Sequence, residues 1–341
     1  MRTPSLFIAA LAINASACRS STADPPAVPK ALEHVRAKLL VNSDLDLCWV
    51  DDAQKAACMY TGDEAETVHP VASLDDAVAL VPGSALVGRT ADGVLRSDLP
   101  ENPGPVVVAE GVRAAAYALS GNYTCWVKTD GSASCAISGE EAKLDLGGAG
   151  ARQVAVSSNQ VCALLEAGGV RCWPLPTPSG PGVAITGLEG ASAIALGYTD
   201  ISSSLDTTWG CAIVGGGNVR CWGDNLYGQA GTATDTSTTV AAPVMDGDDP
   251  SRPLAGVVAL DLRHAKSGAI LRDGSVRTWG ESVMSPGERR ALANRVPDIK
   301  DATQIAMGSW LDCAAANGQI VCWGTSHDAG FDLPFVGYIP N

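Results

Sequence analysis

The sequence has few basic and aromatic residues, and it lacks the short motifs of common enzymes. It contains 23 Lys and Arg against 37 Asp and Glu, which gives a formal net charge of −14. This charge has the wrong sign for counterion release from a phosphate backbone, so no nucleic-acid binding is predicted. We attribute the acidity to solubility rather than to one basic partner. The four histidines form no HExxH motif, and neither a GxSxG element nor a Gly-rich phosphate loop is present, so no catalytic residue, metal or other cofactor is predicted.

A long hydrophobic run is also missing from the N-terminal segment. The apolar stretch Leu6–Ile13 has eight residues, whereas a membrane-spanning helix needs roughly 20. It follows Arg2 and precedes the small residues Ala15-Ser16-Ala17, an arrangement typical of a signal peptide. The segment Ala15–Cys18 resembles a bacterial lipobox, whose cysteine becomes lipid-modified, although Ala15 stands where leucine is commoner. Ordinary cleavage before Cys18 is the alternative.

Three segments follow from this leader. We predict a lipoprotein signal peptide over residues 1–17, a lipid-anchored flexible linker over 18–30, and a folded domain over 31–341. The expected location is the bacterial outer membrane or cell surface, and the alternatives are secretion or the periplasm. Lipidation of Cys18 would also account for the one cysteine that has no partner in the pattern described next.

Ten of the eleven cysteines form five pairs at a separation of nine or ten residues. The pairs are Cys48/Cys58, Cys125/Cys135, Cys162/Cys172, Cys211/Cys221 and Cys313/Cys322. A short apolar run, a turn and a second run lie between the members of each pair, so each pair predicts a hairpin with a cross-strand disulfide. Zinc ligation is the weaker alternative, because the CxxC spacing and paired histidines of zinc sites are missing. Paired cysteines indicate an oxidising compartment.

Two further hairpins, Val87–Ser97 and Gly268–Thr278, fit the same frame although both lack both cysteines. The seven first positions stand 37 to 57 residues apart, which are propeller or solenoid periods. A short apolar strand precedes each of them; the strands begin at Leu39, Ala79, Ala114, Val154, Ile194, Val257 and Ile305. The predicted fold class is all-β, a seven-bladed β-propeller of about four-stranded blades, with cross-strand disulfides within the blades.

The turns and the tryptophans support this register. Five of the six ten-spaced loops have glycine at the third position, where a bulged three-residue turn needs a left-handed residue, and Gln54 is the exception. The nine-spaced pair encloses Asn317-Gly318, the preferred type I′ sequence. Six tryptophans follow a cysteine or its equivalent, namely Trp49, Trp126, Trp173, Trp222, Trp279 and Trp323. Strand alternation directs them away from the sulfurs, so the disulfide face of one blade is expected to meet the tryptophan face of the next in the core.

The segment Asn218–Gly231 closely resembles the repeat signature of the regulator of chromosome condensation family, and Asp273–Gly280 and Gln319–Gly324 are weaker copies. The resemblance covers about residues 31–341 and implies a seven-bladed propeller. The lack of a Trp-Asp dipeptide excludes WD repeats. The family's nucleotide-exchange activity belongs to a nuclear member and is not expected of an exported acidic chain. Some bacterial relatives bind and inhibit β-lactamases through loops on one propeller face, which implies protein binding.

Equivalent loops of a propeller emerge on one face, and here their contents differ. Candidate partner-binding residues in the loops after the inner strands are Tyr123, Tyr198, Asp200, Trp209, His264 and Trp310. Packing of Trp209 and Trp310 onto blade edges is the alternative. We predict a monomeric, membrane-tethered scaffold that binds a protein of the envelope or extracellular space and meets the membrane through its lipid anchor only. A lyase or hydrolase with a site at the channel mouth and an inert envelope component are the alternative functions.

Two further segments carry expectations. The acidic segment Asp246–Asp249 lacks the alternating ligands and terminal Glu of an EF-hand, so we interpret it as an acidic turn rather than as a calcium loop. The segment Phe331–Tyr338 is aromatic enough to pack as a last strand. Whether this segment or residues 19–30 close the ring is left open.

Overall fold

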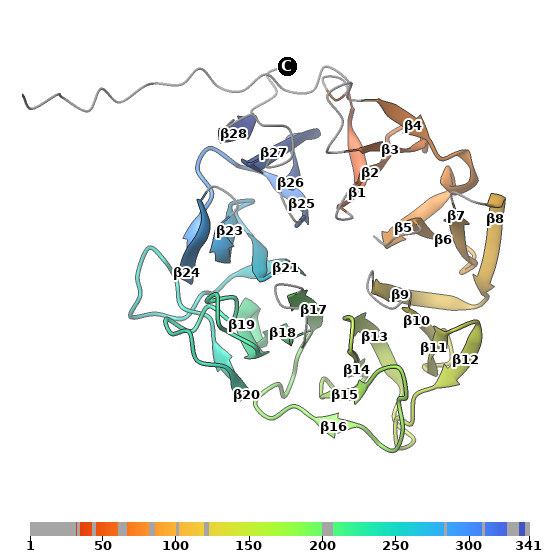
Figure 1. Cartoon of the computed structure of the whole chain (residues 1–341), viewed down its shortest axis with the longest axis horizontal. Coiled ribbons are helices and arrows are strands. Elements are labelled where there is room, and N and C mark those ends of the chain that lie inside the picture. Colours follow the sequence, from red (N-terminus) through yellow and green to blue (C-terminus); the bar gives the residue numbers. More distant parts are fainter. Residues whose placement is uncertain are drawn as a thin grey trace, which may run out of the picture.

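The computed structural model describes residues 32, 35–42, 46–60, 67–81, 86–99, 102–118, 123–199, 207–282, 285–308, 311–325 and 334–337. Seven four-stranded antiparallel sheets surround a central axis, each built from four consecutive strands, and Figure 1 shows them as the blades of a ring. The predicted seven-bladed propeller is therefore confirmed. The predicted signal peptide, Cys18 and the linker lie outside the described residues.

The bounds of the strands follow the blades in chain order. Blade 1 contains β1 (Ala37–Asn42), β2 (Asp46–Asp51), β3 (Ala56–Tyr60) and β4 (Val68–Pro70). Blade 2 contains β5 (Ala77–Val81), β6 (Leu86–Thr90), β7 (Leu95–Leu99) and β8 (Asn102–Ala109). Blade 3 contains β9 (Val112–Ala118), β10 (Tyr123–Lys128), β11 (Ala133–Ile137) and β12 (Glu140–Lys143). Blade 4 contains β13 (Ala151–Val156), β14 (Gln160–Leu165), β15 (Val170–Pro174) and β16 (Val183–Ala184).

The remaining blades carry the longer insertions. Blade 5 contains β17 (Ala193–Thr199), β18 (Thr207–Val214), β19 (Asn218–Gly223) and β20 (Thr238–Pro243). Blade 6 contains β21 (Val257–Arg263), β22 (Lys266–Leu271), β23 (Val276–Ser282) and β24 (Ser285–Arg295). Blade 7 contains β25 (Ala302–Ala306), β26 (Leu311–Ala316), β27 (Gln319–Thr325) and β28 (Pro334–Gly337). The 3-10 turns η2 (Ala72–Leu74) and η3 (Gly215–Gly217) lie between strands, and no helix in the described part of the chain is long and apolar enough to span a membrane.

All five predicted cysteine pairs are directly opposed and bonded within a blade, so the predicted disulfides are confirmed. The bonds are Cys48–Cys58, Cys125–Cys135, Cys162–Cys172, Cys211–Cys221 and Cys313–Cys322. Their Cα atoms lie 3.9 to 4.0 Å apart, somewhat closer than the roughly 4.5 Å typical of opposed residues that exchange no backbone hydrogen bond. The two cysteine-free hairpins have the same register, because Val87 is opposite Ser97 and Gly268 is opposite Thr278.

The predicted turn conformations are also confirmed. Gly131 has a φ of +83° at the third loop position, and Gln54 adopts the left-handed region there with a φ of 60° although it is not a glycine. Asn317 and Gly318 have φ values of 52° and 73°, as a type I′ turn requires. Local turn chemistry and cysteine spacing therefore select the same pairing in each blade.

Four of the five disulfides pack against a tryptophan of the following blade. The cluster that contains Cys125 and Cys135 includes Trp173, and the cluster that contains Cys211 and Cys221 includes Trp279. Cys162 and Cys172 share a cluster with Trp222, and across the closure of the ring Cys313 shares one with Trp49. All six register tryptophans are buried. The predicted stacking of disulfide faces on tryptophan faces is confirmed at these four seams.

The disulfide of blade 1 does not share a cluster with a tryptophan of the following blade, and Cys58 is only half-buried. Its partner Cys48 is 3% exposed. The blade that follows carries Gly88 and Asp98 at the two positions where other blades have tryptophan. No indole is therefore available at this seam to cover the sulfur on β3.

Cys322 is also half-buried, while its partner Cys313 is fully buried. The indole at this seam is Trp49 on β2, and the corresponding position on β3 is Met59. At the three seams where both sulfurs are buried, the tryptophan instead follows the second cysteine or its equivalent, on the third strand of the blade. The sulfur of the second cysteine is therefore buried where the tryptophan of the next blade lies on the third strand, and half-buried where it lies on the second strand.

Glutamines on the inner strands connect adjacent blades. The side-chain amide of Gln153 donates to the Ile194 carbonyl (2.8 Å) and accepts from the Ile194 N–H (3.0 Å). Gln304 of blade 7 accepts from the N–H of Leu40 in blade 1 (2.8 Å) and donates to the carbonyl of Lys38. These bonds satisfy inner-strand backbone groups at the seams between blades.

The ring closes through contacts between whole blades. The segment predicted as a last strand contains β28, which pairs with β27 and completes blade 7. Because each sheet consists of four consecutive strands, none of the described strands joins the two ends of the chain within one sheet. Blade 7 instead meets blade 1 through Gln304 and the cluster around Trp49. Residues 19–30 lie outside the described residues.

Candidate binding face

Antiparallel strand order places the blade connections on two faces of the ring. Connections from first to second and from third to fourth strands join strand ends at one face, which we call the loop face. They are residues 43–45, 61–67, 82–85, 100–101, 119–122, 138–139, 157–159, 175–182, 200–206, 224–237, 264–265, 283–284, 307–310 and 326–333. The other connections belong to the opposite face. Of the predicted binding residues, Tyr123, Tyr198, Trp209 and His264 are described, and they belong to strand ends or connections at this face.

The hairpin β17–β18 extends furthest toward the loop face. Beyond the pair Ala195 and Cys211 it continues for four more residue pairs, to Thr199 opposite Thr207. Within the described residues, the corresponding hairpins of the other blades continue for at most two pairs beyond the equivalent position. At about 3.4 Å per residue, this hairpin extends roughly 7 Å beyond its neighbours. The predicted loop residues Tyr198 and Trp209 therefore lie in the strands β17 and β18.

Trp209 lies in β18 and is fully buried, with 0% of its surface exposed. Its indole lies over Gly197 of the facing strand, where a Cβ would overlap the ring, and its N–H donates to the Ser267 hydroxyl of blade 6 (3.1 Å). The prediction that Trp209 is a loop residue available to a partner is wrong. The glycine opposite it provides the space, so the indole packs into the seam between blades 5 and 6 rather than facing solvent.

Two of the predicted residues come together at this seam. The rings of Tyr198 and His264 are tilted by 52° with centroids 5.2 Å apart, and the Tyr198 hydroxyl lies 3.5 Å from Nε2 of His264. Both side chains are partly exposed. His264 and Ala265 form the two-residue connection of β21 and β22, with φ values of 42° and 53° typical of a type I′ turn. The turn holds His264 against the extended hairpin of blade 5.

A buried ion pair lies just below this turn. Nζ of Lys266 donates to Oδ1 of Asp312 on blade 7 (2.7 Å), and these residues are 3% and 1% exposed. The Gly308 N–H donates to the same carboxylate oxygen (3.1 Å). Burial raises the pKa of the Asp312 carboxyl and lowers the pKa of the Lys266 ammonium, and the attraction between the two groups opposes both shifts.

Asp261 is a second carboxylate at the seam of blades 6 and 7. It accepts the N–H of Met307 in blade 7 at 2.7 Å and the N–H of Leu262 at 3.1 Å. Burial raises the pKa of Asp261, and the nearby charge of Arg263 opposes this shift. The residues Asp261, Lys266 and Asp312 therefore hold blades 6 and 7 together. Neither Lys266 nor Asp312 was among the predicted site residues, because they belong to strands of different blades and the sequence does not show that they meet.

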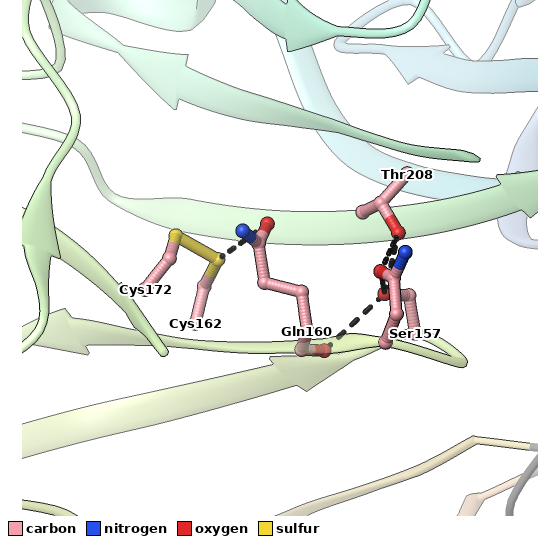
Figure 2. The surroundings of a disulfide bond; sticks show 6 residues. Ser157, Gln160, Cys162, Cys172 and Thr208 are labelled. Carbon is pink, nitrogen blue, oxygen red and sulfur yellow. Dashed lines mark hydrogen bonds between the residues drawn. A yellow bond between two sulfur atoms is a disulfide. The ribbon is translucent and has the colours of Figure 1, made fainter. Parts of the chain in front are cut away.

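A polar contact also supports the extended hairpin on its other side. Figure 2 shows Thr208 of β18 reaching Ser157 and its neighbours in blade 4, close to the disulfide of Cys162 and Cys172. The hydroxyls of Ser157 and Thr208 are 2.9 Å apart, and Thr208 donates to the side-chain carbonyl of Asn159. The side-chain oxygen of Gln160 lies 3.6 Å from Sγ of Cys162, which carries no hydrogen in the disulfide. Blades 4 and 6 thus hold the hairpin from both sides.

The signature segment of blade 5 forms a network of hydrogen bonds at the loop face. Gln229 donates to Asp224 (2.9 Å) and accepts the Tyr227 N–H (2.8 Å), while its carbonyl accepts the Ser267 hydroxyl (2.9 Å). The motif that carried the family resemblance therefore ties blade 5 to blade 6. It leaves Leu226 56% exposed beside the partly exposed Tyr227.

The other predicted residues are placed as follows. Tyr123 begins β10 and is partly exposed, in blade 3 and away from the seam of blades 5 and 6. Asp200 and Trp310 lie outside the described residues.

The acidic turn at Asp246–Asp249 is bound by a cation of the chain itself, since Oδ2 of Asp248 lies 2.7 Å from the Arg277 guanidinium. Among the residues that the structure describes, no group of three His, Cys, Asp or Glu side chains is arranged to hold a metal ion.

Comparisons with known proteins define the fold. Neither a protein-family model nor a curated protein matches the chain by sequence. Yeast RCC1 (Prp20), solved bound to Kap60, superposes with a TM-score of 0.64 at 14% identity, covering 98% of this chain and 91% of that one. Human WBSCR16 gives 0.62 at 14% identity, covering 82% and 85%. The CRINKLY WD40 ectodomain of the Arabidopsis thaliana receptor kinase ACR4 gives 0.51 at 15% identity, covering 90% and 98%. The chain thus has an RCC1-like propeller fold.

Proposed function

We propose that this protein is an exported binding scaffold, tethered to a membrane through Cys18, which presents its loop face to a protein partner. The observation that carries the proposal is the extended β17–β18 hairpin, which holds Tyr198 against His264 above the neighbouring connections. Partly exposed aromatic residues on a preorganised support are typical centres of protein interfaces, because little side-chain entropy is lost on binding.

The architecture supports this role. Five disulfides and the seams between blades restrain the strands that carry the loops, which favours a fixed support for a binding site. Solved propellers of similar fold bind proteins: Prp20 was solved with Kap60 and has been studied for binding to Gsp1p and histones. The ACR4 propeller is an ectodomain, which is a precedent for this fold outside the cell.

The enzymatic alternative needs an accessible acid or base at the channel mouth. The buried carboxylate Asp312 is bound by Lys266 and Gly308, and Asp261 is bound by two backbone N–H groups. Both carboxylates are thus hydrogen-bonded within the fold and join blades 6 and 7. The described site therefore favours binding over catalysis.

Affinity capture tests the proposal. The purified full chain is immobilised and exposed to envelope and secreted proteins of its own cells, beside the variants Tyr198→Ala and Val258→Ala. Val258 is a matched control because it is 53% exposed and lies next to the opposite face, at the start of β21. We expect a protein that the wild type and Val258→Ala retain and that Tyr198→Ala loses. Retention by Tyr198→Ala with loss by Val258→Ala would overturn the assignment of the face.

Membrane tethering has a separate test. Cells that express the full chain are labelled with a radioactive fatty acid, and the chain is compared with Cys18→Ala. We expect label and membrane association in the wild type only. Equal release of both chains into the soluble fraction, without label in either, would show that the chain is exported without an anchor.

A further inference from the structure

The disulfide of blade 1 differs from the other four in its surroundings. Cys48 is buried, but Cys58 on β3 is only half-buried. Where a tryptophan of the next blade lies on the third strand, both cysteines of the pair are buried. Blade 2 has no such tryptophan, and Leu74 of η2 fills the space over Gly88 on its second strand, since a Cβ at Gly88 would lie 2.8 Å from Cδ2 of Leu74. One cysteine of this disulfide is therefore partly accessible in the folded ring.

A histidine is placed beside the accessible cysteine. His69 on β4 is directly opposite Cys58 on β3, and it is exposed. Directly opposed residues of antiparallel strands direct their side chains to the same face of the sheet, with Cβ atoms about 4.5–5.5 Å apart. The imidazole therefore belongs to the same face of blade 1 as the disulfide, at the outer side of the blade.

The other four disulfides lack this combination. The residues opposite their second cysteines are Ala142, Val183, Ala242 and Gly337. None of these four residues has a side chain that exchanges a proton. Cys322 is half-buried like Cys58, but it is opposite Gly337, and the second cysteines of the other three pairs are buried. Partial exposure and an opposed imidazole thus coincide at one of the five disulfides.

The core does not depend on this bond. Cys48 and Cys58 belong to none of the hydrophobic clusters of the described residues, whereas the cysteines of the other four pairs do. In blade 2 the equivalent residues Val87 and Ser97 keep the same register without a disulfide. We therefore expect the ring to stay folded when the bond in blade 1 opens.

We propose that Cys48 and Cys58 form a thiol–disulfide exchange site that reacts with a dithiol and is assisted by His69. A thiolate of the dithiol attacks Sγ of Cys58, the bond to Sγ of Cys48 breaks, and Cys48 takes up a proton. The second thiol of the reagent loses its proton and attacks its own sulfur in the mixed disulfide, which releases Cys58 as a thiolate. His69 donates the proton that neutralises this thiolate.

The exchange balances and is reversible. The cysteine pair gains two electrons and two protons, the dithiol is oxidised to a disulfide, and His69 regains its proton through solvent. In the reverse direction His69 accepts the proton of Cys58, and the thiolate attacks a disulfide of the reagent. Figure 1 shows blade 1 across the ring from β17 and β18, so this site is separate from the proposed binding site. Its reactants are dithiols, either small molecules or protein dithiols of the CxxC type.

Limited reduction of the native full chain tests the proposal. The oxidised chain is treated with dithiothreitol in one series and with a purified CxxC protein in another. Free thiols are alkylated at intervals and located by mass spectrometry of proteolytic fragments. We expect Cys48–Cys58 to open at least about tenfold faster than the three pairs in which both cysteines are buried. His69→Gln should slow this opening by about threefold or more and leave the rate of Cys313–Cys322 unchanged.

Two controls separate the exchange chemistry from unfolding. In urea sufficient to unfold the chain, all five pairs should open at similar rates, and the advantage of Cys48–Cys58 should disappear. Ala142→His places an imidazole opposite the buried Cys135 and should not speed the opening of that pair, because attack on its sulfur is blocked.

The outcomes decide between the explanations. Simultaneous opening of all five pairs in the native chain, or earlier opening of a pair that is fully buried, would overturn the exchange site. An unchanged rate in His69→Gln would overturn the role of the imidazole. Opening by dithiothreitol alone would support the site with small dithiols as its reactants, and opening by both reagents would support protein dithiols as well.

Discussion

Nζ of Lys266 lies 2.7 Å from Oδ1 of Asp312, and the pair repeats a relationship found one blade earlier. Lys266 stands two residues before the disulfide-equivalent position Gly268, and Asp312 stands one residue before Cys313 of the next blade. Trp209 and Ser267 occupy the same two positions at the preceding seam and are joined by a 3.1 Å hydrogen bond. The same two register positions thus join blades 5 and 6 by an indole–hydroxyl hydrogen bond and blades 6 and 7 by an ion pair.

Removal of one member of the buried ion pair should strongly lower the stability of the fold. Lys266→Met leaves the Asp312 carboxylate buried without its cation, and we expect the free energy of unfolding to fall by about 3–5 kcal/mol. The double variant Lys266→Met/Asp312→Asn removes both charges and keeps an acceptor for the Gly308 N–H, so most of that loss should be recovered. Urea unfolding of the three chains measures both values.

The exposed ion pair between Lys55 and Asp75 provides the control. Its ammonium group is largely solvated, so Lys55→Met should change stability little. A double variant of the buried pair that is as unstable as the single Lys266→Met chain would contradict the explanation by an uncompensated charge.

The cysteine-free blades predict how the disulfides can be replaced. In blade 2 the directly opposed pair is Val87 and Ser97, so Cys125→Val/Cys135→Ser copies a pairing that this chain already uses. We expect the fold to persist and the free energy of unfolding to fall by up to about 2.7 kcal/mol, the chain-entropy value for a loop of this length. The reverse change, Val87→Cys/Ser97→Cys, should raise stability. Denaturant unfolding under oxidising conditions tests both, and loss of folding in the first variant would contradict the view of the disulfides as staples.

Two glycines with the same backbone conformation separate strain from crowding. Gly274 and Gly139 both have positive φ, at 73° and 84°. A Cβ at Gly274 would lie 2.5 Å from backbone atoms of Asp301 at the next blade, whereas a Cβ at Gly139 would have no atom within 4 Å. Gly139→Ala should cost about 1–2 kcal/mol through the left-handed conformation alone. Gly274→Ala should cost more in the same unfolding assay, and equal losses would show that the seam yields without strain.

Acid stability should depend on the turn of blade 6. The Ser275 hydroxyl and N–H donate to Oδ1 of Asp273 (2.7 and 3.0 Å), and these bonds hold the pKa of the Asp273 carboxyl below its usual value. Below a pH of about 4 the unfolded chain therefore binds this proton more readily than the folded chain does, so the contribution is present above that pH and is lost as the pH falls through the folded pKa. Asp273→Asn and Ser275→Ala should both make the urea midpoint fall less steeply with decreasing pH. Unchanged slopes in both variants would contradict the assignment.

Local patterns predicted the fold well because each blade is specified by nearby residues. Cysteine spacing, the glycine of the three-residue loop and Asn317-Gly318 all act within one hairpin, and the structure confirms each of them. Val87 and Gly268 were identified by register alone, and their partners are the predicted ones. Period and register are properties of a single strand pair, which a linear sequence displays directly.

Contacts between blades were harder to predict. Trp209 was wrongly assigned to a loop. Its indole fills a space over Gly197, on the facing strand of the extended hairpin, and this space is not visible in the sequence. The pair of Lys266 and Asp312 spans 46 residues of sequence. Partners on different sheets share no register, so residue types alone do not identify them.

The burial of the disulfides was also difficult to predict from the sequence. The bonds of Cys58 to Cys48 and of Cys322 to Cys313 were predicted correctly from spacing. The partial exposure of Cys58 and Cys322 depends on which residues the next blade brings to the seam. The contact between Tyr198 and His264 likewise followed only from the structure. Spacing therefore predicts a bond within a blade and does not predict its surroundings.

The central claim is that the loop face is the binding face, and site-specific photo-cross-linking tests it most directly. A photoreactive phenylalanine analogue replaces Tyr198 in one full-length chain and Val258 in another, each expressed in its own cells and irradiated. We predict a cross-linked partner from position 198 and not from position 258. A partner cross-linked from position 258 and absent at position 198 would contradict the claim.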